Sequence, residues 1–257
     1  MKKNLAVPLA ALLLLLPLLL APVYADTIRL RADEWFPVNG DPQSSRPGFA
    51  VELAATIWRD FGHQIDYQLM GWGRSLEAAR NGSIDCVIGT DRTEAPDLLF
   101  PQTPLHTDGV HVYVRKGDNW RFTDESSLAR RTVAVINEYS YGGQMDAWLA
   151  DPANATRIQM AYGEAALEGN IRKLLAGRVD LLLESPMVMS VALQDLELAR
   201  YVTDAGESDP PTPFYIACGS SNPKTVKWLQ QFDQGAEKLK ESGAWQAILE
   251  RYGLQIE

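Results

Sequence analysis

The spacing of hydrophobic and polar positions changes several times along this chain, and each change predicts a strand or a helix. Segment 27–32 alternates apolar and polar side chains, as a half-buried strand does. Segment 49–59 repeats its apolar side chains at helical spacing, and 64–70 returns to a strand. A helix-like run at 74–80 and an apolar run at 84–89 complete a strand–helix–strand–helix–strand order. That order is typical of a parallel sheet covered by helices.

A similar pattern recurs about 95 residues later. Gly82 and Gly177 each end a helix-like run, and each is followed three residues on by an Asp and then by a short apolar run. Two such copies predict two α/β lobes built alike, which usually bind a ligand in the cleft between them. The remaining predicted elements are strands at 110–115, 132–136, 157–160, 179–183 and 214–218, and helices near 142–149, 164–176, 222–243 and 244–252.

The first 25 residues have the pattern of an export signal. Lys2 and Lys3 precede a leucine-rich run at 5–20, and small residues surround Ala25. We predict a signal peptide over 1–25, cleaved after Ala25, and therefore a periplasmic protein. The alternative is a membrane anchor, but the apolar run is somewhat short to cross a bilayer.

Charge and composition narrow the possible partners. The chain has 24 Lys and Arg against 33 Asp and Glu, a net charge of −9, which argues against nucleic acid and anionic membranes. Its three histidines are scattered, so we expect no metal site, and no cofactor is indicated. The two cysteines, Cys86 and Cys218, allow either a disulfide or two buried thiols.

Several segments, taken in order along the chain, resemble the bacterial extracellular solute-binding proteins of family 3, the periplasmic binding proteins of amino acid uptake. They are 47–53, the strand after Gly82, Leu99-Phe100-Pro101, the strand after Gly177, and 238–253. The lead-in Trp72-Gly73-Arg74 is similar to a divergent branch of that family.

This resemblance implies a two-lobed periplasmic-binding-protein fold of type II, with a ligand cleft between the lobes. Lobe 1 would comprise 26–104 and 214–257, and lobe 2 would comprise 109–210. The hinges would lie near 105–108 and 210–214. The returning strand at 214–218 would then lie beside the strand at 84–89, which favours a Cys86–Cys218 disulfide. The implied partners are a small solute and an ABC-type permease or a sensor receptor, and the implied state is a monomer.

Loops at the carboxyl ends of the predicted strands carry the candidate ligand-binding residues, because open α/β sheets bind ligands there. They are Trp35, Phe36, Trp72, Arg74, Thr90, Arg92, Tyr139, Ser140, Tyr141 and Glu184. Aromatic faces can shield a ligand or contact a cation, and an arginine can bind a carboxylate. Backbone N–H groups near Ser140 favour an anion, and Glu184 can bind an ammonium group. The aromatic residues could instead belong to the core, and Arg92 to the surface; of Tyr139 and Tyr141, we expect one to face the cleft.

Two positions depart from the family pattern. Amino acid binders carry an Arg where this chain has Glu94, and an Asp where it has Ser185. The usual clamp for an α-amino acid is therefore incomplete, and Arg74 or Arg92 would have to contact a ligand carboxylate.

We accordingly predict a non-enzymatic periplasmic protein that captures a small polar solute, an amino acid or related carboxylate, by hinge closure for uptake or sensing. Two alternatives remain. One is a dehydratase-like enzyme on the same fold, with Glu94 and Glu184 as candidate acids or bases. The other is an interaction protein whose cleft is filled by its own side chains.

Overall fold

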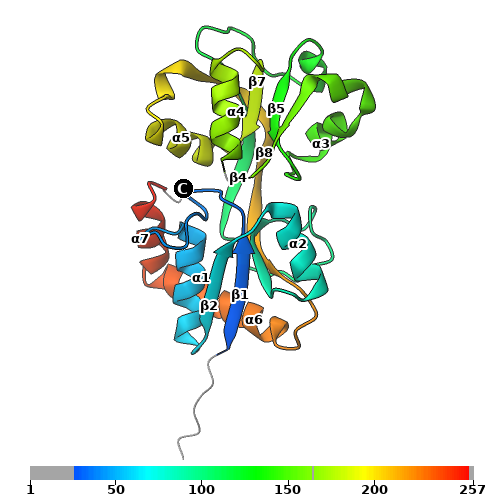
Figure 1. Cartoon of the computed structure of the whole chain (residues 1–257). Helices are drawn as coiled ribbons and strands as arrows, with labels where there is room; N and C mark the ends of the chain where they lie inside the picture. The colour runs from blue at the N-terminus through cyan, green and yellow to red at the C-terminus, as the bar shows by residue number, and fades with distance from the viewer. Residues whose placement is uncertain (1–25, 164, 255–257) are drawn as a thin grey trace, which may run out of the picture.

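Two α/β lobes are joined by two long strands, β4 (His106–Arg115) and β8 (Val202–Cys218) (Figure 1). The computed structural model describes residues 26–163 and 165–254, so the predicted signal peptide lies outside the described residues. The strands form an eight-stranded sheet in the order β2-β1-β3-β8-β4-β7-β5-β6. This architecture confirms the predicted mixed α/β, two-lobed fold.

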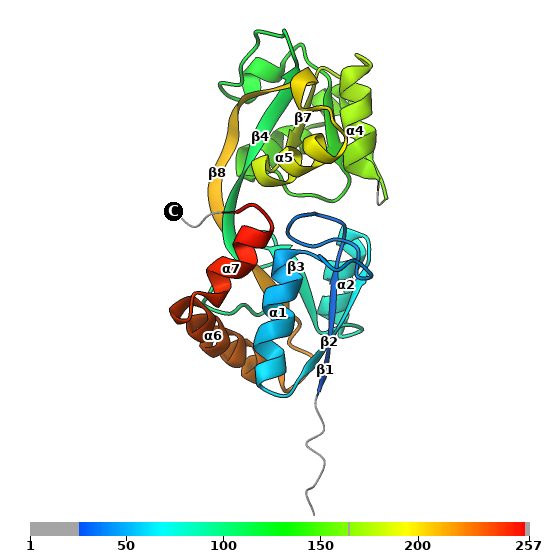
Figure 2. The same ribbon diagram turned by 90° about the vertical axis from the view of Figure 1, so that its left-hand side faces the viewer.

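Lobe 1 is built on the parallel strands β1 (Thr27–Ala32), β2 (Gln64–Leu69) and β3 (Cys86–Thr90). Its helices are α1 (Phe49–Asp60), α2 (Trp72–Asn81), α6 (Thr225–Glu241) and α7 (Ala244–Arg251). Figure 2 shows α1, α6 and α7 on one face of these strands and α2 on the other. The larger core of the lobe lies under α1, α6 and α7 and contains the fully buried Trp58 and Phe232.

Lobe 2 repeats this plan with the parallel strands β5 (Val133–Ile136), β6 (Ile158–Ala161) and β7 (Leu181–Glu184). Its helices are α3 (Gly143–Ala150), α4 (Ala166–Leu175) and α5 (Pro186–Asp195), with short 3₁₀ turns at Glu125–Leu128, Pro152–Arg157 and Ala199–Tyr201. Two apolar cores cover the two faces of its strands, one against α3 and one against α4 and α5.

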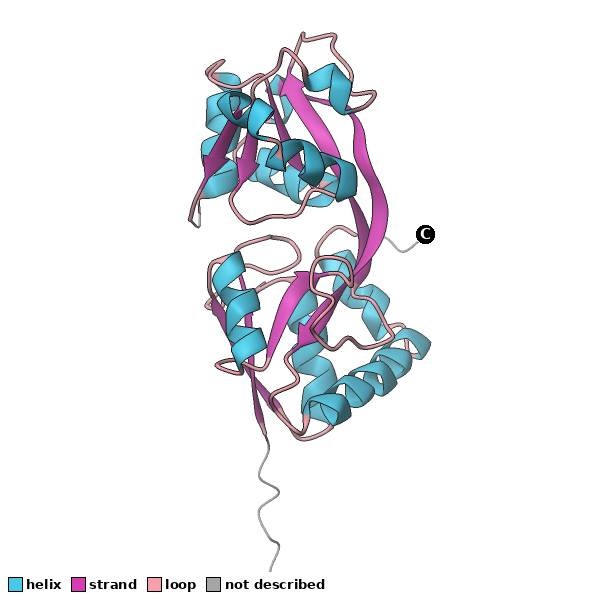
Figure 3. Cartoon of the chain, turned by 90° about the vertical axis from the view of Figure 1, so that its right-hand side faces the viewer, coloured by secondary structure: helices cyan, strands magenta, loops and turns pink. Residues whose placement is uncertain are grey.

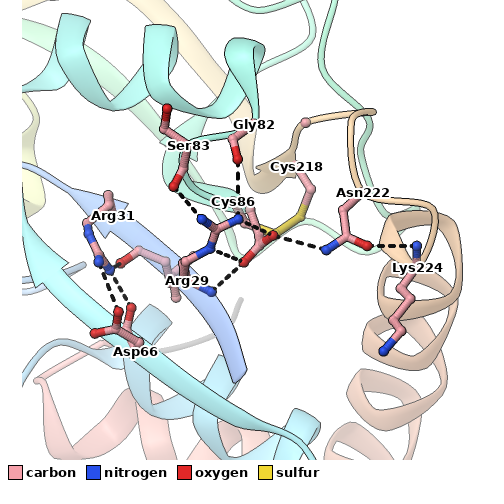
Figure 4. Close-up of polar contacts among 12 residues, drawn as sticks. Arg29, Arg31, Asp66, Gly82, Ser83, Cys86, Cys218, Asn222 and Lys224 are labelled. Atoms are coloured by element: carbon pink, nitrogen blue, oxygen red, sulfur yellow. Dashed lines mark hydrogen bonds and ion pairs between the residues drawn. A yellow bond between two sulfur atoms is a disulfide. The ribbon is translucent and has the colours of Figure 1, made fainter. Parts of the chain in front are cut away.

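The repeated Asp of the two Gly-containing segments has the same structural role in both lobes. The Asp85 carboxylate accepts a hydrogen bond from the backbone N–H of Arg29 at 2.8 Å and pairs with its guanidinium at 2.9 Å (Figure 4). The Asp180 carboxylate accepts from the backbone N–H of Thr132 at 2.8 Å. Each Asp therefore fixes the start of the neighbouring strand, which explains why the pattern occurs twice.

Cys86 and Cys218 form a disulfide between β3 and β8, as the resemblance implied. The two residues face each other in the antiparallel pairing of these strands, and neither is exposed. The bond therefore attaches the lobe 1 end of β8 to its neighbour β3, a parallel strand of that lobe.

Strand β8 is much longer than predicted, because its proline-rich part was interpreted as a connector. Residues 209–213 pair with β4 along one side, although proline lacks a backbone N–H. Strand β3 pairs with β8 only at residues 215–218, so, among the described residues, 209–213 have a strand on one side alone, a position that tolerates proline. Figure 3 shows β4 and β8 passing together between the lobes. Their pairing is irregular between Asp108 and Tyr113, close to the predicted hinges, which stay predictions.

Within residues 26–163 and 165–254, no helix is both long and apolar enough to span a membrane.

Candidate ligand-binding cleft

A cavity of about 140 Å³ lies between the lobes, where the carboxyl ends of strands from both lobes meet. Six of its twenty lining residues are acidic, and these are Asp33, Asp91, Glu94, Asp108, Glu184 and Asp209. Five are aromatic, and these are Trp35, Trp72, Tyr139, Tyr141 and Phe214. None of the twenty is Lys, Arg or His. The cavity therefore combines aromatic walls with an excess of carboxylates.

A second cavity, of about 420 Å³, shares one wall with the first. The shared residues are Asp33, Trp35, Trp72, Tyr139 and Glu184. Arg74, at the start of α2, lines this larger cavity and not the smaller one, and its side chain is exposed.

Hydrogen bonds within the shared wall connect the two lobes. The Trp35 indole Nε1 of lobe 1 donates to Glu184 Oε1 of lobe 2 at 3.3 Å. The Tyr139 hydroxyl of lobe 2 donates to the Asp33 carboxylate of lobe 1. The structure therefore shows the two lobes in direct contact across the cleft.

Glu184 ends β7 and is only 4 % exposed. Its Oε1 also accepts a hydrogen bond from the Ser185 backbone N–H at 2.8 Å, whereas Oε2 is buried without a hydrogen-bond partner. Burial raises the pKa of Glu184 to about 7, and the charges of Asp108 and Asp33 act in the same direction. A positively charged group beside Oε2 would lower that pKa and favour the ionised carboxylate.

Burial also disfavours the ionised form of two further carboxyl groups in the smaller cavity. Burial raises the pKa of Asp33 to about 6, against the opposing effect of the hydrogen bond from Tyr139. Burial also raises the pKa of Asp108, whose Oδ2 is buried without a hydrogen-bond partner. Asp33 follows β1 and Asp108 lies in β4, so the unfavourable charge comes from several elements.

Glu94 occupies the position where the family carries an arginine, and it faces the cavity. It accepts hydrogen bonds from the Trp72 Nε1 at 2.7 Å and from the Thr90 hydroxyl at 2.7 Å. Burial nevertheless raises its pKa. The two residues that we expected to contact a ligand at this point therefore direct their donors to Glu94.

The start of α3, predicted to favour an anion, already binds a carboxylate of the chain itself. Asp146 accepts hydrogen bonds from the Tyr141 backbone N–H at 2.7 Å and from the Ser140 hydroxyl at 2.6 Å. Asp146 thus accepts hydrogen bonds from two of the groups that we expected a ligand anion to contact.

Most of the predicted ligand-binding residues line at least one of the two cavities. They are Trp35, Trp72, Arg74, Thr90, Tyr139, Ser140, Tyr141 and Glu184. Both tyrosines line the smaller cavity, although we expected one of them to face away. The Tyr141 hydroxyl accepts a hydrogen bond from the Ile136 backbone N–H at 2.7 Å, so it already has a partner.

Phe36 and Arg92 line neither cavity, and their predicted ligand contacts need correction. Phe36 packs against Tyr252 in the lobe 1 core, with ring centroids 5.8 Å apart. Arg92 places its guanidinium over the rings of Phe100 and Tyr215 and donates to the Pro101 carbonyl at 2.8 Å. Stacking between two aromatic rings satisfies the arginine outside the cleft.

Thirteen of the twenty lining residues were not among the predicted ligand contacts, and five of them are Asp33, Asp108, Asp209, Thr212 and Phe214. Asp33 lies directly after β1, next to a predicted contact. The other four lie in β4 and β8, within or next to the predicted hinges. Residues 105–108 and 209–213 show no regular alternation of polar and apolar positions, so no periodic signal pointed to them.

In the described part of the chain, no group of three or more His, Cys, Asp or Glu is arranged to hold a metal ion.

Comparison with solved structures shows the same fold in several binding proteins. A histidine kinase sensor domain with similarity to periplasmic binding proteins has a TM-score of 0.73 at 21 % identity, covering 89 % of this chain and 96 % of that chain. An ancestral arginine-binding protein bound to arginine has a TM-score of 0.70 at 20 % identity, covering 88 % and 97 %. The GluR0 ligand-binding core from Nostoc punctiforme in complex with L-glutamate has a TM-score of 0.67 at 16 % identity, covering 88 % and 98 %.

These identities are low, so the likeness to the solved structures demonstrates the fold alone. No curated protein matches the chain. Residues 32–255, however, match the family described as bacterial extracellular solute-binding proteins, family 3. The match covers most of the chain, and the chain therefore belongs to that family.

Proposed function

We propose that this protein captures a small polar solute in the periplasm by closing its two lobes around the cleft. The observation that carries the proposal is the cavity between the lobes, lined by predicted contact residues from both. Hydrogen bonds such as Trp35 to Glu184 join one lobe to the other and would form on closure. Closure about the predicted hinges 105–108 and 210–214 is a common motion of two-lobed binding proteins.

The loaded protein would deliver its solute to an inner-membrane ABC permease or present it to a sensor receptor. Membership of a solute-binding family supports both partners, and the shared fold of a histidine kinase sensor domain supports the second. Export would follow from cleavage after Ala25, and the mature protein would act as a monomer. Mass measurement of the protein recovered from the periplasm, starting at Asp26, tests the cleavage site.

The amino acid or related carboxylate that the sequence suggested is one solute class of suitable size. The solved neighbours bound to arginine and to L-glutamate support that class by their fold. The carboxylate-binding role of Arg92 is not part of this proposal, because Arg92 stacks outside the cleft.

One observation favours a catalytic alternative. Glu184 is buried in the cavity with a pKa raised to about 7, which suits a general acid or base at neutral pH. An enzyme of the dehydratase type would convert a bound arogenate-like or prephenate-like compound. Incubation with such compounds, followed by mass spectrometry of the products, tests this alternative.

Thermal unfolding of mature 26–257 against amino acids, small carboxylates, amines and short peptides tests the proposed function. A solute at 100 times its dissociation constant stabilises a protein by about 2.7 kcal/mol, which raises Tm by roughly 5–10 °C for a protein of this size. Failure of every solute to raise Tm would contradict solute capture. It would instead favour the interaction protein, although the structure leaves cavities between the lobes.

A further inference from the structure

We propose that the cleft binds an organic cation without a carboxylate, namely an alkyl amine or guanidine about as long as an amino acid side chain. This inference deepens the proposed function and rests on it. It concerns which chemical class the closed lobes can enclose.

The donors of the cleft are the first part of the argument, because a ligand carboxylate needs donors. The Ser140 hydroxyl and the Tyr141 N–H bind Asp146. The Thr90 hydroxyl and the Trp72 indole bind Glu94. Each of these groups already donates to a carboxylate of the chain, so a ligand carboxylate would have to displace one.

The acceptors of the cleft favour a cation, because two of its buried carboxylate oxygens have no hydrogen-bond partner. Glu184 is 4 % exposed, lines both cavities and has an Oε2 atom without a partner. The Oδ2 atom of Asp108 is also buried without a partner. A buried carboxylate oxygen without a donor costs free energy, and an ammonium or guanidinium group supplies several donors together with the opposite charge.

The aromatic walls distinguish an organic cation from a metal ion. Trp35, Trp72, Tyr139 and Phe214 line the same cavity as the carboxylates. Aromatic faces attract ammonium and guanidinium groups and also cover an alkyl chain, whereas divalent ions such as Ca²⁺ and Mg²⁺ bind oxygen ligands. The described residues contain no cluster arranged for a metal ion, and two indoles of the cavity donate to its carboxylates.

The size of the cleft limits the ligand. A cavity of about 140 Å³ compares with the roughly 150 Å³ apolar cavity that holds a benzene molecule. One cationic end with a few methylenes fits this space, and a longer chain would extend past the shared wall into the larger cavity. Arg74 lines only the larger cavity, together with four acidic residues, and does not line the smaller one.

Two matched ligand pairs test the inference by isothermal titration calorimetry on the mature protein at pH 7.5 in 150 mM salt. 1,5-Diaminopentane differs from L-lysine, and agmatine from L-arginine, only in lacking the carboxylate. We expect the amine of each pair to bind at least about tenfold more tightly, since the carboxylate must enter a cavity with six acidic residues.

A matched pair of variants assigns the effect to the buried carboxylate. Glu184→Gln removes the charge at nearly constant shape, and we expect it to weaken amine binding at least about thirtyfold. Glu237→Gln removes a charge from the exposed face of α6 and should leave the affinity unchanged. Circular dichroism shows whether both variants are folded. Asp108→Asn removes a second negative charge from the cleft and should also weaken amine binding.

The outcomes separate this inference from the proposed function. Amino acids that bind as tightly as their decarboxylated partners, or Ca²⁺ or Mg²⁺ binding more tightly than any amine, would overturn the inference and leave solute capture intact. The same holds if no amine binds while another solute raises Tm. Absence of binding by every solute tested would overturn both proposals.

Discussion

At the scale of single residues, Arg92 and Glu94 show that spacing alone does not assign a contact. The family position for a carboxylate-binding arginine holds Glu94, which faces the cavity and accepts from Trp72 and Thr90. Arg92, two residues earlier, was the available arginine, but it stacks 4.9 Å from the Phe100 ring centroid. Because the arginine lies two residues before the family position, this chain has a negative charge in the cleft where the family has a positive one.

Arg92→Ala should reduce stability without changing ligand affinity. Loss of the stacking on Phe100 and Tyr215 should cost about 0.5–1 kcal/mol of unfolding free energy, because the site is exposed. Urea unfolding measures that loss, and calorimetry with the best ligand measures affinity. Arg130→Ala, on an exposed loop, is the matched control and should change neither. A tenfold loss of affinity in Arg92→Ala would place this arginine back in the binding site.

At the scale of elements, the sequence predicted the parts of the fold that have a regular period. The strand at 27–32 was predicted with the bounds that the structure shows, and the helix predicted at 49–59 extends to Asp60. Pro186 begins α5, because proline fits the first helical turn. Strand β8 was largely missed, since its prolines indicated a connector and periodicity does not reveal that part of a strand pairs on one side only.

The candidate site was predictable to the extent that it follows from strand ends. The loops after the predicted strands indicated Trp35, Trp72, Tyr139 and Glu184, and all four line the smaller cavity. Parallel strands bring their carboxyl ends together, so these loops meet. The roles of the donors were not predictable. The hydrogen bond from the Ser140 hydroxyl to Asp146, for example, depends on the backbone conformation at the first turn of α3.

Contact between α2 and the loop after β5 yields a prediction about closure. A side chain at Gly73, in the first turn of α2, would collide with the Glu138 carboxylate of lobe 2. The Glu138 carboxylate is the end of an exposed, flexible side chain and can move aside, so Gly73→Ala should weaken ligand binding by only about two- to threefold, although alanine favours the helix by about 1 kcal/mol. Calorimetry measures this change, and small-angle X-ray scattering with saturating ligand shows whether the radius of gyration changes with it.

A matched glycine controls for this change. Gly169 also lies in a helix, α4, and a Cβ there would meet nothing within 4 Å. Gly169→Ala should keep both affinity and radius of gyration. Equal affinities for the two variants would show that Glu138 and α2 need not approach each other for binding.

The disulfide between β3 and β8 provides a second prediction at this scale. It closes a loop with a sequence separation of 132 residues, so removing it with Cys86→Ala and Cys218→Ala together should lower the unfolding free energy by about 2–5 kcal/mol. Ligand affinity should stay within about threefold, because the cavity is lined by the other end of β3.

Unfolding with and without a reductant provides the control for the double variant. The reductant should destabilise the unmodified protein towards the value of the double variant and leave that variant unchanged. An unmodified protein that is insensitive to complete reduction would show that the bond contributes nothing to stability.

At the scale of the whole molecule, carboxyl groups occur in two different environments. Asp85 and Asp180 hold the starts of strands, where hydrogen bonds and nearby arginines keep their pKa below the usual value. Asp33, Glu94 and Glu184 come from both lobes and meet in the cleft, where burial raises their pKa. Burial disfavours the ionised forms of these carboxyl groups more than their mutual repulsion does, so a bound cation would favour the proposed closed state.

This arrangement makes the stability of the ligand-free protein depend on pH. Glu184 has an ordinary pKa of 4.5 in the unfolded chain and a pKa of about 7 in the folded protein. Between these values the folded state binds a proton that the unfolded state has lost, so the unfolding free energy falls as pH rises. Glu184 contributes on the order of 3 kcal/mol to the unfolding free energy. This contribution is complete below about pH 4.5 and is lost as the pH rises to about 7. Asp33 acts in the same direction with its pKa of about 6.

Comparison with Glu184→Gln isolates the contribution of this one group, because glutamine does not titrate and every other group is shared. Asp33, Asp108, Tyr139 and Tyr141 face Glu184 and remain in both proteins. Urea unfolding at pH 4.5, 5.5, 6.5 and 7.5 should show the stability of the unmodified protein falling relative to the variant by up to about 3 kcal/mol. Glu237→Gln should follow the unmodified protein throughout. Parallel curves for the unmodified protein and Glu184→Gln would show that folding does not raise the pKa of Glu184, and its burial would then carry no penalty for a bound cation to relieve.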